Sequence, residues 1–490
     1  MSMSEIAAGP ENFDRVDGLL SLRYAAALAG DPIRAMQQVY SRHGRLIEFR
    51  PPLHRTIGIR RFVFAVGPRF NQAVFNNPAV FRSSGLMLKG PRASAQRRVR
   101  HGLVTMNGAQ HAHYRKLIQP SLRRARMDGL VSAIAAVVDA ELGNWPVRQK
   151  VDLWALCRRL TQRASLAVLF QSSGCAALAE AEQSTDLINR HLTMGALATV
   201  RGCPINVPYL PYSRYLQHAE RTEAQLVRWA KGREGRTDSE DMISLVLNTS
   251  NEIGQPISDG AIGGHVFTLL AATYETCQSV LTWLLFMLAQ HPHASANLLD
   301  ETENLSLEGA DLVERLERCT WLDAVIKEAM RILPPVPMQI RAAIQDTVLE
   351  GCVVEKQTRV ILSPFLTNRL PELYPDADRF LPERWQTIDP NQFEYLVFSA
   401  GPRTCPGYRF ATNLLKVTLA QIIRRFRISI VERAQVDYRV TITTIPRRSI
   451  PAIIYPQDRN FAASPVTGNI QNLVRFDAER SRYQFRGKAH

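Results

Sequence analysis

Cys405 is the residue of this sequence whose surroundings most favour metal chemistry. It lies in the run FSAGPRTCPG at residues 398–407, which has the pattern F-x-x-G-x-R-x-C-x-G. The thiolate is the form of cysteine that binds metals, and a nearby cation or a helix N-terminus lowers the thiol pKa. Arg403 stands just before the cysteine, and apolar residues recur at helical spacing after Gly407. We therefore expect Cys405 to bind a metal, the alternative being an inert buried thiol.

A second candidate for chemistry is the acid–hydroxyl pair Glu275 and Thr276, inside the longest helical pattern, residues 258–290. Burial of a carboxyl group in an apolar helix is costly unless the group has a partner. A carboxyl group beside a hydroxyl suits proton transfer. The alternative is that Thr276 bonds back to the preceding turn and Glu275 reaches solvent.

Two further pairs have the spacing of neighbours on one face of a helix. Glu328 and Arg331 are three residues apart, and the double proline at residues 334–335 ends their helix. On a surface such a pair contributes only about 0–1 kcal/mol, so the spacing alone is a weak signal. His111 and Arg115 are four residues apart and also share a face.

In this order along the chain, the motifs resemble those of the cytochrome P-450 superfamily, the haem-thiolate monooxygenases, in a soluble bacterial-type form. The resemblance implies an α+β, mainly helical fold with a long central helix and small β-sheets at its side. It implies that haem b lies between the long helix and the helix after the cysteine loop. Cys405 would be the axial ligand of the haem iron, where a thiolate favours O–O cleavage.

The resemblance also implies roles for individual residues. Thr276 would steady dioxygen and Glu275 would pass protons, while Thr273 stands where the family usually has glycine. The structural group behind the cysteine loop would be Glu328, Arg331 and Arg384. The residues implied as haem contacts are His111, Arg115, Arg341, Phe398, Arg403, Cys405 and Gly407. The apolar substrate pocket is expected to be lined by Phe267, Leu270, Ala271, Val336, Met338, Ile340 and Ile445.

Composition favours a globular protein of a reducing compartment. The chain has 490 residues, 46% of them apolar, and seven scattered cysteines without a C-x-x-C pair. The most apolar stretch, residues 266–289, contains Glu275 and Gln278, which favours a buried helix over a membrane span. We expect a cytoplasmic monomer without a transmembrane anchor. Residues 1–456 are expected to form one catalytic domain, and residues 457–490 a polar C-terminal tail.

The net charge of +15 is concentrated in basic clusters at residues 89–100, 115–126 and 424–425. Such clusters suit nucleic acid, an anionic membrane surface or an acidic protein, or they form solvated faces. The resemblance implies docking of an acidic ferredoxin or flavodoxin, which would act with its reductase. No G-x-G-x-x-G motif lies between a strand and a helix, so NAD(P)H is expected to supply electrons through these separate proteins. No nucleic-acid motif accompanies the basic residues, and no nucleic-acid partner is expected.

The expected activity is that of a haem-dependent monooxygenase, which inserts one atom of dioxygen into a lipophilic organic substrate. Two alternatives stay open. One is a haem-thiolate peroxygenase or isomerase on the same fold, which the Glu275–Thr276 pair disfavours. The other is a basic non-enzymatic protein that binds nucleic acid or anionic lipid.

Overall fold

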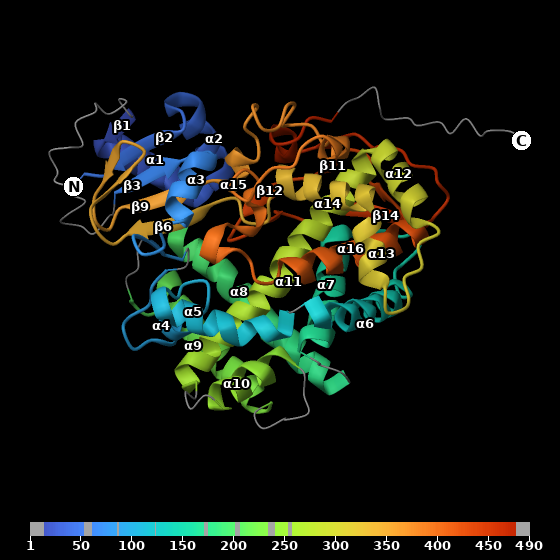
Figure 1. The fold of residues 1–490 in the computed structure, drawn as a ribbon, viewed down its shortest axis with the longest axis horizontal. Helices are drawn as coiled ribbons and strands as arrows, with labels where there is room; N and C mark the ends of the chain where they lie inside the picture. The colour runs from blue at the N-terminus through green and yellow to red at the C-terminus, as the bar shows by residue number, and fades with distance from the viewer. Residues whose placement is uncertain are drawn as a thin grey trace, which may run out of the picture.

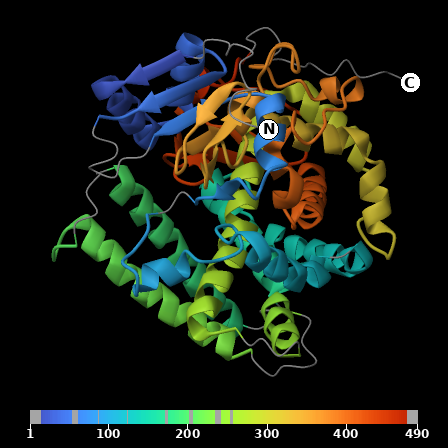
Figure 2. The same ribbon diagram turned by 60° about the vertical axis from the view of Figure 1, so that its left-hand side comes forward.

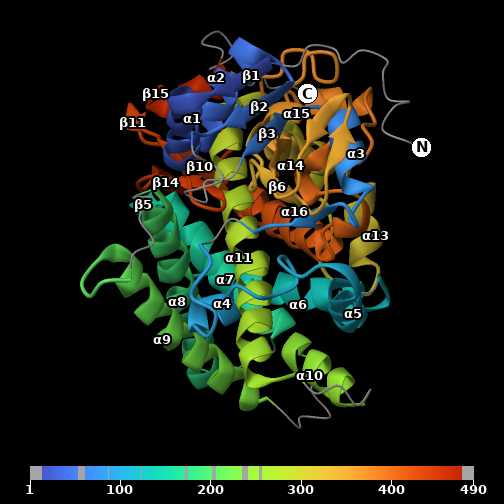
Figure 3. The same cartoon turned by 90° about the vertical axis from the view of Figure 1, so that its left-hand side faces the viewer.

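Helix α11 (Asp259–Gln290) runs through the middle of the protein, between a sheet-rich side and a helix-rich side (Figures 1 and 3). The computed structural model describes residues 14–52, 61–85, 88–122, 124–170, 175–200, 206–233, 241–252 and 257–476. Most side chains of α11 are buried, as expected of a helix that is apolar on all faces. Ser258 precedes it in extended conformation, and it ends at His291, before Pro292. The long central helix expected from the sequence is confirmed.

The largest sheet has the strand order β1-β2-β3-β9-β6-β4. Strands β2 and β3 pair antiparallel with Leu46 opposite Ala65, whereas β3 and β9 pair parallel. Its strands are β1 (Asp14–Asp17), β2 (Leu46–Arg50), β3 (Phe62–Ala65), β4 (Phe81–Ser83), β6 (Gln339–Ala343) and β9 (Arg359–Leu362). Early and late parts of the chain therefore lie side by side at one edge of the protein (Figure 2).

Four smaller sheets complete the strand structure of the described residues. In one of them β14 (Pro451–Pro456) lies between β10 (Phe426–Ile430) and β5 (Lys150–Asp152). The others pair β11 (Ala434–Gln435) with β15 (Val466–Thr467), β12 (Tyr438–Val440) with β13 (Thr444–Pro446), and β7 (Thr347–Leu349) with β8 (Cys352–Val354).

Helices fill the rest of the fold. The other helices are α1 (Gly18–Gly30), α2 (Pro32–His43), α3 (Pro68–Phe75), α4 (Ala95–Val99), α5 (Gly108–Ile118), α6 (Arg124–Leu142), α7 (Leu153–Leu169), α8 (Cys175–Val200), α9 (Pro211–Lys231), α10 (Met242–Glu252), α12 (Pro292–Thr302), α13 (Leu312–Arg318), α14 (Thr320–Ile332), α15 (Pro364–Thr367) and α16 (Tyr408–Arg425). Short 3-10 turns occur at η1 (Gln119–Leu122), η2 (Pro382–Gln386), η3 (Leu396–Phe398), η4 (Gly401–Arg403) and η5 (Asn469–Asn472). The mainly helical α+β fold with small sheets is confirmed.

Part of the expected C-terminal tail belongs to the folded body. Strand β15 pairs with β11, and the side chains of Ile470, Leu473 and Val474 are buried. The boundary expected at residue 456 is therefore too early, because the few apolar residues beyond it pack onto the core. Residues 477–490 lie outside the described part of the chain.

Candidate functional site

Backbone hydrogen bonds hold the Cys405 sulfur at the start of α16. The N–H of Cys405 donates to the carbonyl of Phe398 at 2.8 Å, and the N–H of Gly407 donates to the sulfur. Gly401 has φ +60°, and a Cβ there would lie 3.2 Å from the carbonyl oxygen of Phe75, so the turn requires glycine. A Cβ on Gly407 would meet no described protein atom within 4 Å. The loop therefore fixes the sulfur and leaves space beside Gly407.

The surroundings of Cys405 do not by themselves favour the thiolate. Burial raises the pKa of the thiol, against the opposing effects of the Gly407 N–H and the Arg115 guanidinium. The cation near the sulfur is thus Arg115 of α5, which also donates to the Thr404 carbonyl at 2.8 Å, and not Arg403 as the sequence suggested. A coordinated metal ion deprotonates a thiol outright, so a bound metal would stabilise the thiolate that the protein surroundings of Cys405 disfavour.

A partly buried basic cluster lies beside the cysteine loop. Burial lowers the pKa of its histidine, His111, to about 4, and the positive charges of three arginines add to that effect. Burial also lowers the pKa of Arg341 and of Arg403 to about 10, with further contributions from neighbouring arginines. Within the described residues no carboxylate pairs with the cluster. Its members are His111, Arg115, Arg341 and Arg403.

The arginines of the cluster are oriented by backbone and amide oxygens. Arg403 donates to the side-chain oxygen of Asn107 at 2.8 Å and to the Met106 carbonyl. Arg341 donates to the Ile340 carbonyl at 3.0 Å. Arginine pairs with carboxylates through two parallel charge-assisted hydrogen bonds. A group with two carboxylates, such as haem with its propionates, would therefore fit the cluster and reduce the repulsion among its positive charges.

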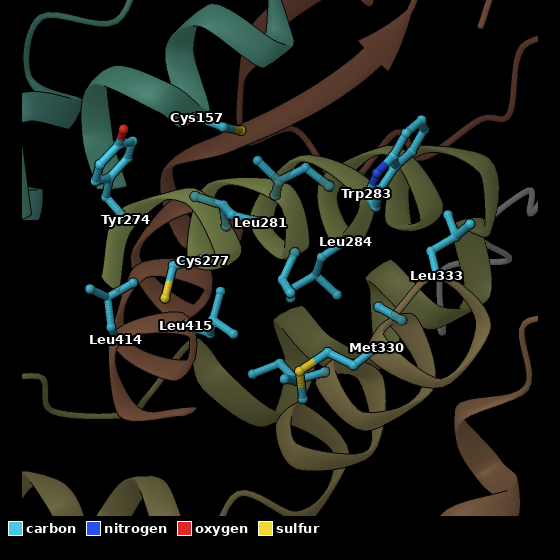
Figure 4. Close-up of a cluster of buried hydrophobic side chains, with 14 of the residues drawn as sticks. Cys157, Tyr274, Cys277, Leu281, Trp283, Leu284, Met330, Leu333, Leu414 and Leu415 are labelled. Atoms are coloured by element: carbon cyan, nitrogen blue, oxygen red, sulfur yellow. The ribbon is translucent and has the colours of Figure 1, made fainter. Parts of the chain in front are cut away.

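Helices α11 and α16 pack against each other just beyond the candidate acid–hydroxyl pair. Figure 4 shows the sulfur of Cys277 and the side chain of Leu281 on α11 near Leu414 and Leu415 of α16. The pKa of the Cys277 thiol is raised to about 12, by burial and then by the charge of Cys405, so the two sulfurs lie in one region. The preceding turns of α11 are the part of that helix available to a group bound at Cys405.

Those turns present a partly exposed face. Thr276, Thr273 and Leu269 are partly exposed, and Ala272 is exposed. The Thr276 hydroxyl donates to the Ala272 carbonyl at 2.8 Å, and the Thr273 hydroxyl to the Leu269 carbonyl at 2.6 Å. The Thr276 hydroxyl therefore bonds back to the preceding turn, as in the alternative expected from the sequence. Its oxygen lone pairs can still accept hydrogen bonds. Ala272 and Leu269 lie four and seven residues before Thr276, a helical spacing that could have identified both, but they were missed.

Glu275 points away from solvent. Its side chain is buried, and its Oε1 accepts a hydrogen bond from the Thr443 hydroxyl at 2.9 Å. Burial raises the pKa of Glu275 to about 7, although the Thr443 bond opposes the rise. The alternative in which this carboxyl reaches solvent is therefore wrong. Thr443 lies far away in the sequence and carries no spacing signal.

The predicted Glu–Arg–Arg group is brought together in full. Arg331 donates to both carboxylate oxygens of Glu328, at 2.8 and 2.9 Å, and Arg384 donates to one of them at 3.0 Å. The Leu381 N–H and the Trp385 indole N–H also donate to Glu328, which has no exposed side-chain surface. Trp385 was missed as a partner, although the sequence places it next to Arg384.

The expected pocket residues fall into two groups. Leu270 has no exposed surface, and the Phe267 ring packs edge-to-face against the His191 ring with centroids 5.7 Å apart. Ile445 is buried as well. The half-buried apolar residues are Ala271, Val336, Met338 and Ile340.

Three arginines of the basic clusters expected to dock a partner are engaged within the chain. Arg98 binds both carboxylate oxygens of Glu223 at 2.6 Å. Arg425 pairs with Asp139, and Arg424 donates to the Leu305 carbonyl. The side chains of residues 123–126 lie outside the described set, whereas Arg92, Arg97 and Lys116 are exposed.

No described helix is both long and apolar enough to span a membrane. In the described ranges, no group of three or more His, Cys, Asp or Glu side chains could hold a metal ion.

Comparisons with known proteins agree on one family. The family model described as "Cytochrome P450" matches residues 37–448. Cyclooctatin synthase of Streptomyces melanosporofaciens is 27% identical over 89% of this chain and 94% of its own. Pentalenene oxygenase of Streptomyces avermitilis is 27% identical, over 85% of this chain and 91% of its own. Cyclooctat-9-en-7-ol 5-monooxygenase of Streptomyces melanosporofaciens is 28% identical, over 79% and 83%.

Solved structures show the same fold. Cyanobacterial CYP120A1 with bound retinoic acid superposes with a TM-score of 0.74 at 22% identity, over 86% of this chain and 93% of that one. The haem domain of cytochrome P450DA also gives a TM-score of 0.74 at 22% identity, over 89% and 95%.

Proposed function

The chain belongs to the cytochrome P450 family of haem-thiolate monooxygenases, and from this premise we propose that it hydroxylates or otherwise oxidises a lipophilic organic substrate with one atom of dioxygen. Haem, when bound, supplies the redox chemistry that activates dioxygen. We assign Cys405 as the axial ligand and residues 1–476 as one catalytic domain. NAD(P)H would supply electrons through an acidic ferredoxin or flavodoxin and its reductase.

The observation that best supports monooxygenation is the acid–hydroxyl pair on α11. Glu275 is buried with a pKa near 7, so its carboxyl group can both donate and accept a proton at neutral pH. Thr276 lies next to it on the partly exposed face of the helix. Peroxygenases on this fold usually lack such an acid–threonine pair, so the pair disfavours that alternative.

The substrate class rests on the relatives and on the apolar residues near the site. Pentalenene and cyclooctat-9-en-7-ol are, by their names, an alkene and an alkenol. The half-buried apolar side chains of Ala271, Val336, Met338 and Ile340 suit such a mainly hydrocarbon ligand. We therefore propose a cyclic hydrocarbon or a sparsely oxygenated derivative as substrate.

The function is tested by comparing oxidants. The purified haem protein would be given pentalenene as a probe substrate, once with a ferredoxin, its reductase and NAD(P)H, and once with hydrogen peroxide alone. Oxidised product with the reductant system supports the proposal. Fast turnover with peroxide and none with the reductant system would establish the peroxygenase alternative instead. Purified protein without haem absorbance would support the binding-protein alternative.

The basic cluster predicts the strength of haem retention. We propose that His111, Arg115, Arg341 and Arg403 hold the propionates, with Phe398 and Gly407 beside the ring. Arg403→Leu should accelerate haem transfer to apomyoglobin roughly 10- to 100-fold, because a charge-assisted hydrogen bond contributes about 1.5–3 kcal/mol. Arg409→Leu is the control, since that guanidinium bonds to Tyr408 on its own helix. An unchanged transfer rate in Arg403→Leu would remove this arginine from the cofactor site.

Thr276 is expected to govern how electrons are used. Thr276→Ala should keep the haem spectrum but lower the product formed per NAD(P)H about tenfold or more, with peroxide formed instead, since positioned proton transfer contributes 10²- to 10⁴-fold. The matched control is Thr282→Ala, a buried threonine of the same helix that bonds back to Gln278 in the same way. A ratio of product to NAD(P)H that stays at the native value in Thr276→Ala would exclude Thr276 from proton delivery.

A further inference from the structure

The β12–β13 hairpin is docked along one face of α11. Glu275, Ser279 and Trp283 follow one another at intervals of four residues, so they share that face. The Thr443 hydroxyl donates to Glu275 at 2.9 Å. The Ser279 hydroxyl and the Trp283 indole N–H donate to the Thr444 carbonyl at 2.6 and 2.7 Å. Three bonds from three successive turns therefore fix the hairpin turn to the helix.

A third segment fixes the same turn from the other side. The Thr444 N–H donates to the Pro335 carbonyl at 2.9 Å, and its hydroxyl donates to the Pro334 carbonyl at 3.0 Å. Thr443 and Thr444 are both almost fully buried. The Thr443 hydroxyl is thus held in place by its own backbone, and not by the carboxyl group that it meets.

The carboxyl group of Glu275 has few other neighbours that bear charge. Its pKa is raised by burial and lowered by Thr443, and no charged side chain from the described elements contributes. On α11 itself, the Tyr274 phenol bonds to Asn189 and to the Thr185 carbonyl, and the Thr276 hydroxyl bonds to the Ala272 carbonyl. Neither of these groups competes for the Glu275 oxygen.

We propose that Thr443 is a positioning residue for proton delivery, which orients Glu275 beside Thr276 and stabilises its carboxylate form. This inference rests on the proposed function, because it assigns a purpose to Glu275 in the same site. In each cycle the carboxyl group would give one proton toward the reacting oxygen, and the resulting carboxylate would take one back from water. Thr443 itself gains and loses no proton.

The test is the titration of Glu275 in the resting holoenzyme, followed by the infrared band of its protonated carboxyl group. Glu275→Gln identifies the band by removing it. Thr443→Val removes the hydroxyl that stabilises the carboxylate, so the pKa should rise by about one to two units, the size expected for a hydrogen bond to a charged group. Thr443→Ser keeps a hydroxyl at the same place and should restore the native titration. Thr302→Val, a buried threonine bonded to the Leu298 carbonyl elsewhere, should change nothing.

Turnover gives an independent readout. In Thr443→Val the pH dependence of product formed per NAD(P)H should move upward by the same amount, whichever form of Glu275 limits the step. A native titration in Thr443→Val, or a shifted one in Thr443→Ser, would overturn the inference. If the valine variant does not fold, the titration of the Thr443→Ser and Thr443→Ala proteins decides, with a shift expected only in the second. Native coupling in Glu275→Gln would instead overturn the proton role in the proposed function.

Discussion

Replacement of Cys405 by alanine is expected to abolish the thiolate-type absorption band of the reduced, carbon monoxide-bound protein and to lower turnover by more than about 100-fold. Loss of an outer partner of a metal ligand typically costs 10- to 100-fold, and loss of the ligand itself should cost more. The reason is chemical, because a thiolate ligand pushes electron density toward the iron and so favours O–O cleavage. The measurement is the difference spectrum together with product formation.

The matched control is Cys277→Ala. Cys277 is a buried thiol of the same region, whereas Cys405 is partly exposed, and Cys277 packs among the leucines of α11 and α16 (Figure 4). Its removal should leave the spectral band in place. A thiolate-type band that survives in Cys405→Ala and disappears in Cys277→Ala would reverse the assignment.

Replacement of Glu328 by glutamine is expected to destabilise the fold by about 3–5 kcal/mol, the usual cost of breaking a buried ion pair. The change leaves the guanidinium groups of Arg331 and Arg384 buried without their carboxylate. Urea unfolding of the holoenzyme, followed by circular dichroism, measures the loss. Glu314→Ala is the control, because its pair with Arg318 is exposed and should contribute less than about 1 kcal/mol. Equal effects in the two variants would contradict a bracing role for Glu328.

The same group predicts a pH dependence with a definite sign. Burial alone would raise the pKa of Glu328, but Arg331, Arg384 and the Leu381 N–H together lower it below its ordinary value. A carboxyl group with a lowered folded-state pKa stabilises the fold above its unfolded-state pKa. That contribution is lost as the pH falls through the folded-state value. Glu328→Gln should therefore flatten the acid side of the stability profile.

The elements that carry short-range signals could be predicted from the sequence. The apolar periodicity of residues 258–290 and the prolines that follow it identify α11, and the glycines and spacing of residues 398–407 identify the cysteine loop. The contact between Glu328 and Arg331 could also be predicted, because residues three apart on a helix are neighbours in any fold. The family and the helical fold follow from these local patterns in their order.

Contacts between distant segments could not be predicted in this way. The sequence suggested Arg403 as the cation near the sulfur, but that side chain turns to Met106 and Asn107, and Arg115 of α5 approaches instead. The sequence predicted Phe267 in the pocket, and it carried no signal for the edge-to-face contact of this ring with His191.

The sequence by itself determined the candidate metal ligand, Cys405, and which residues share a helix face, because both depend on spacing along a short stretch of chain. Only the tertiary structure decided the charge state of the site. The pKa of Glu275 near 7, its bond to Thr443, and the repulsion within the basic cluster all arise from burial and from partners far apart in the chain. Desolvation and long-range hydrogen bonds depend on the folded surroundings, which no local pattern encodes.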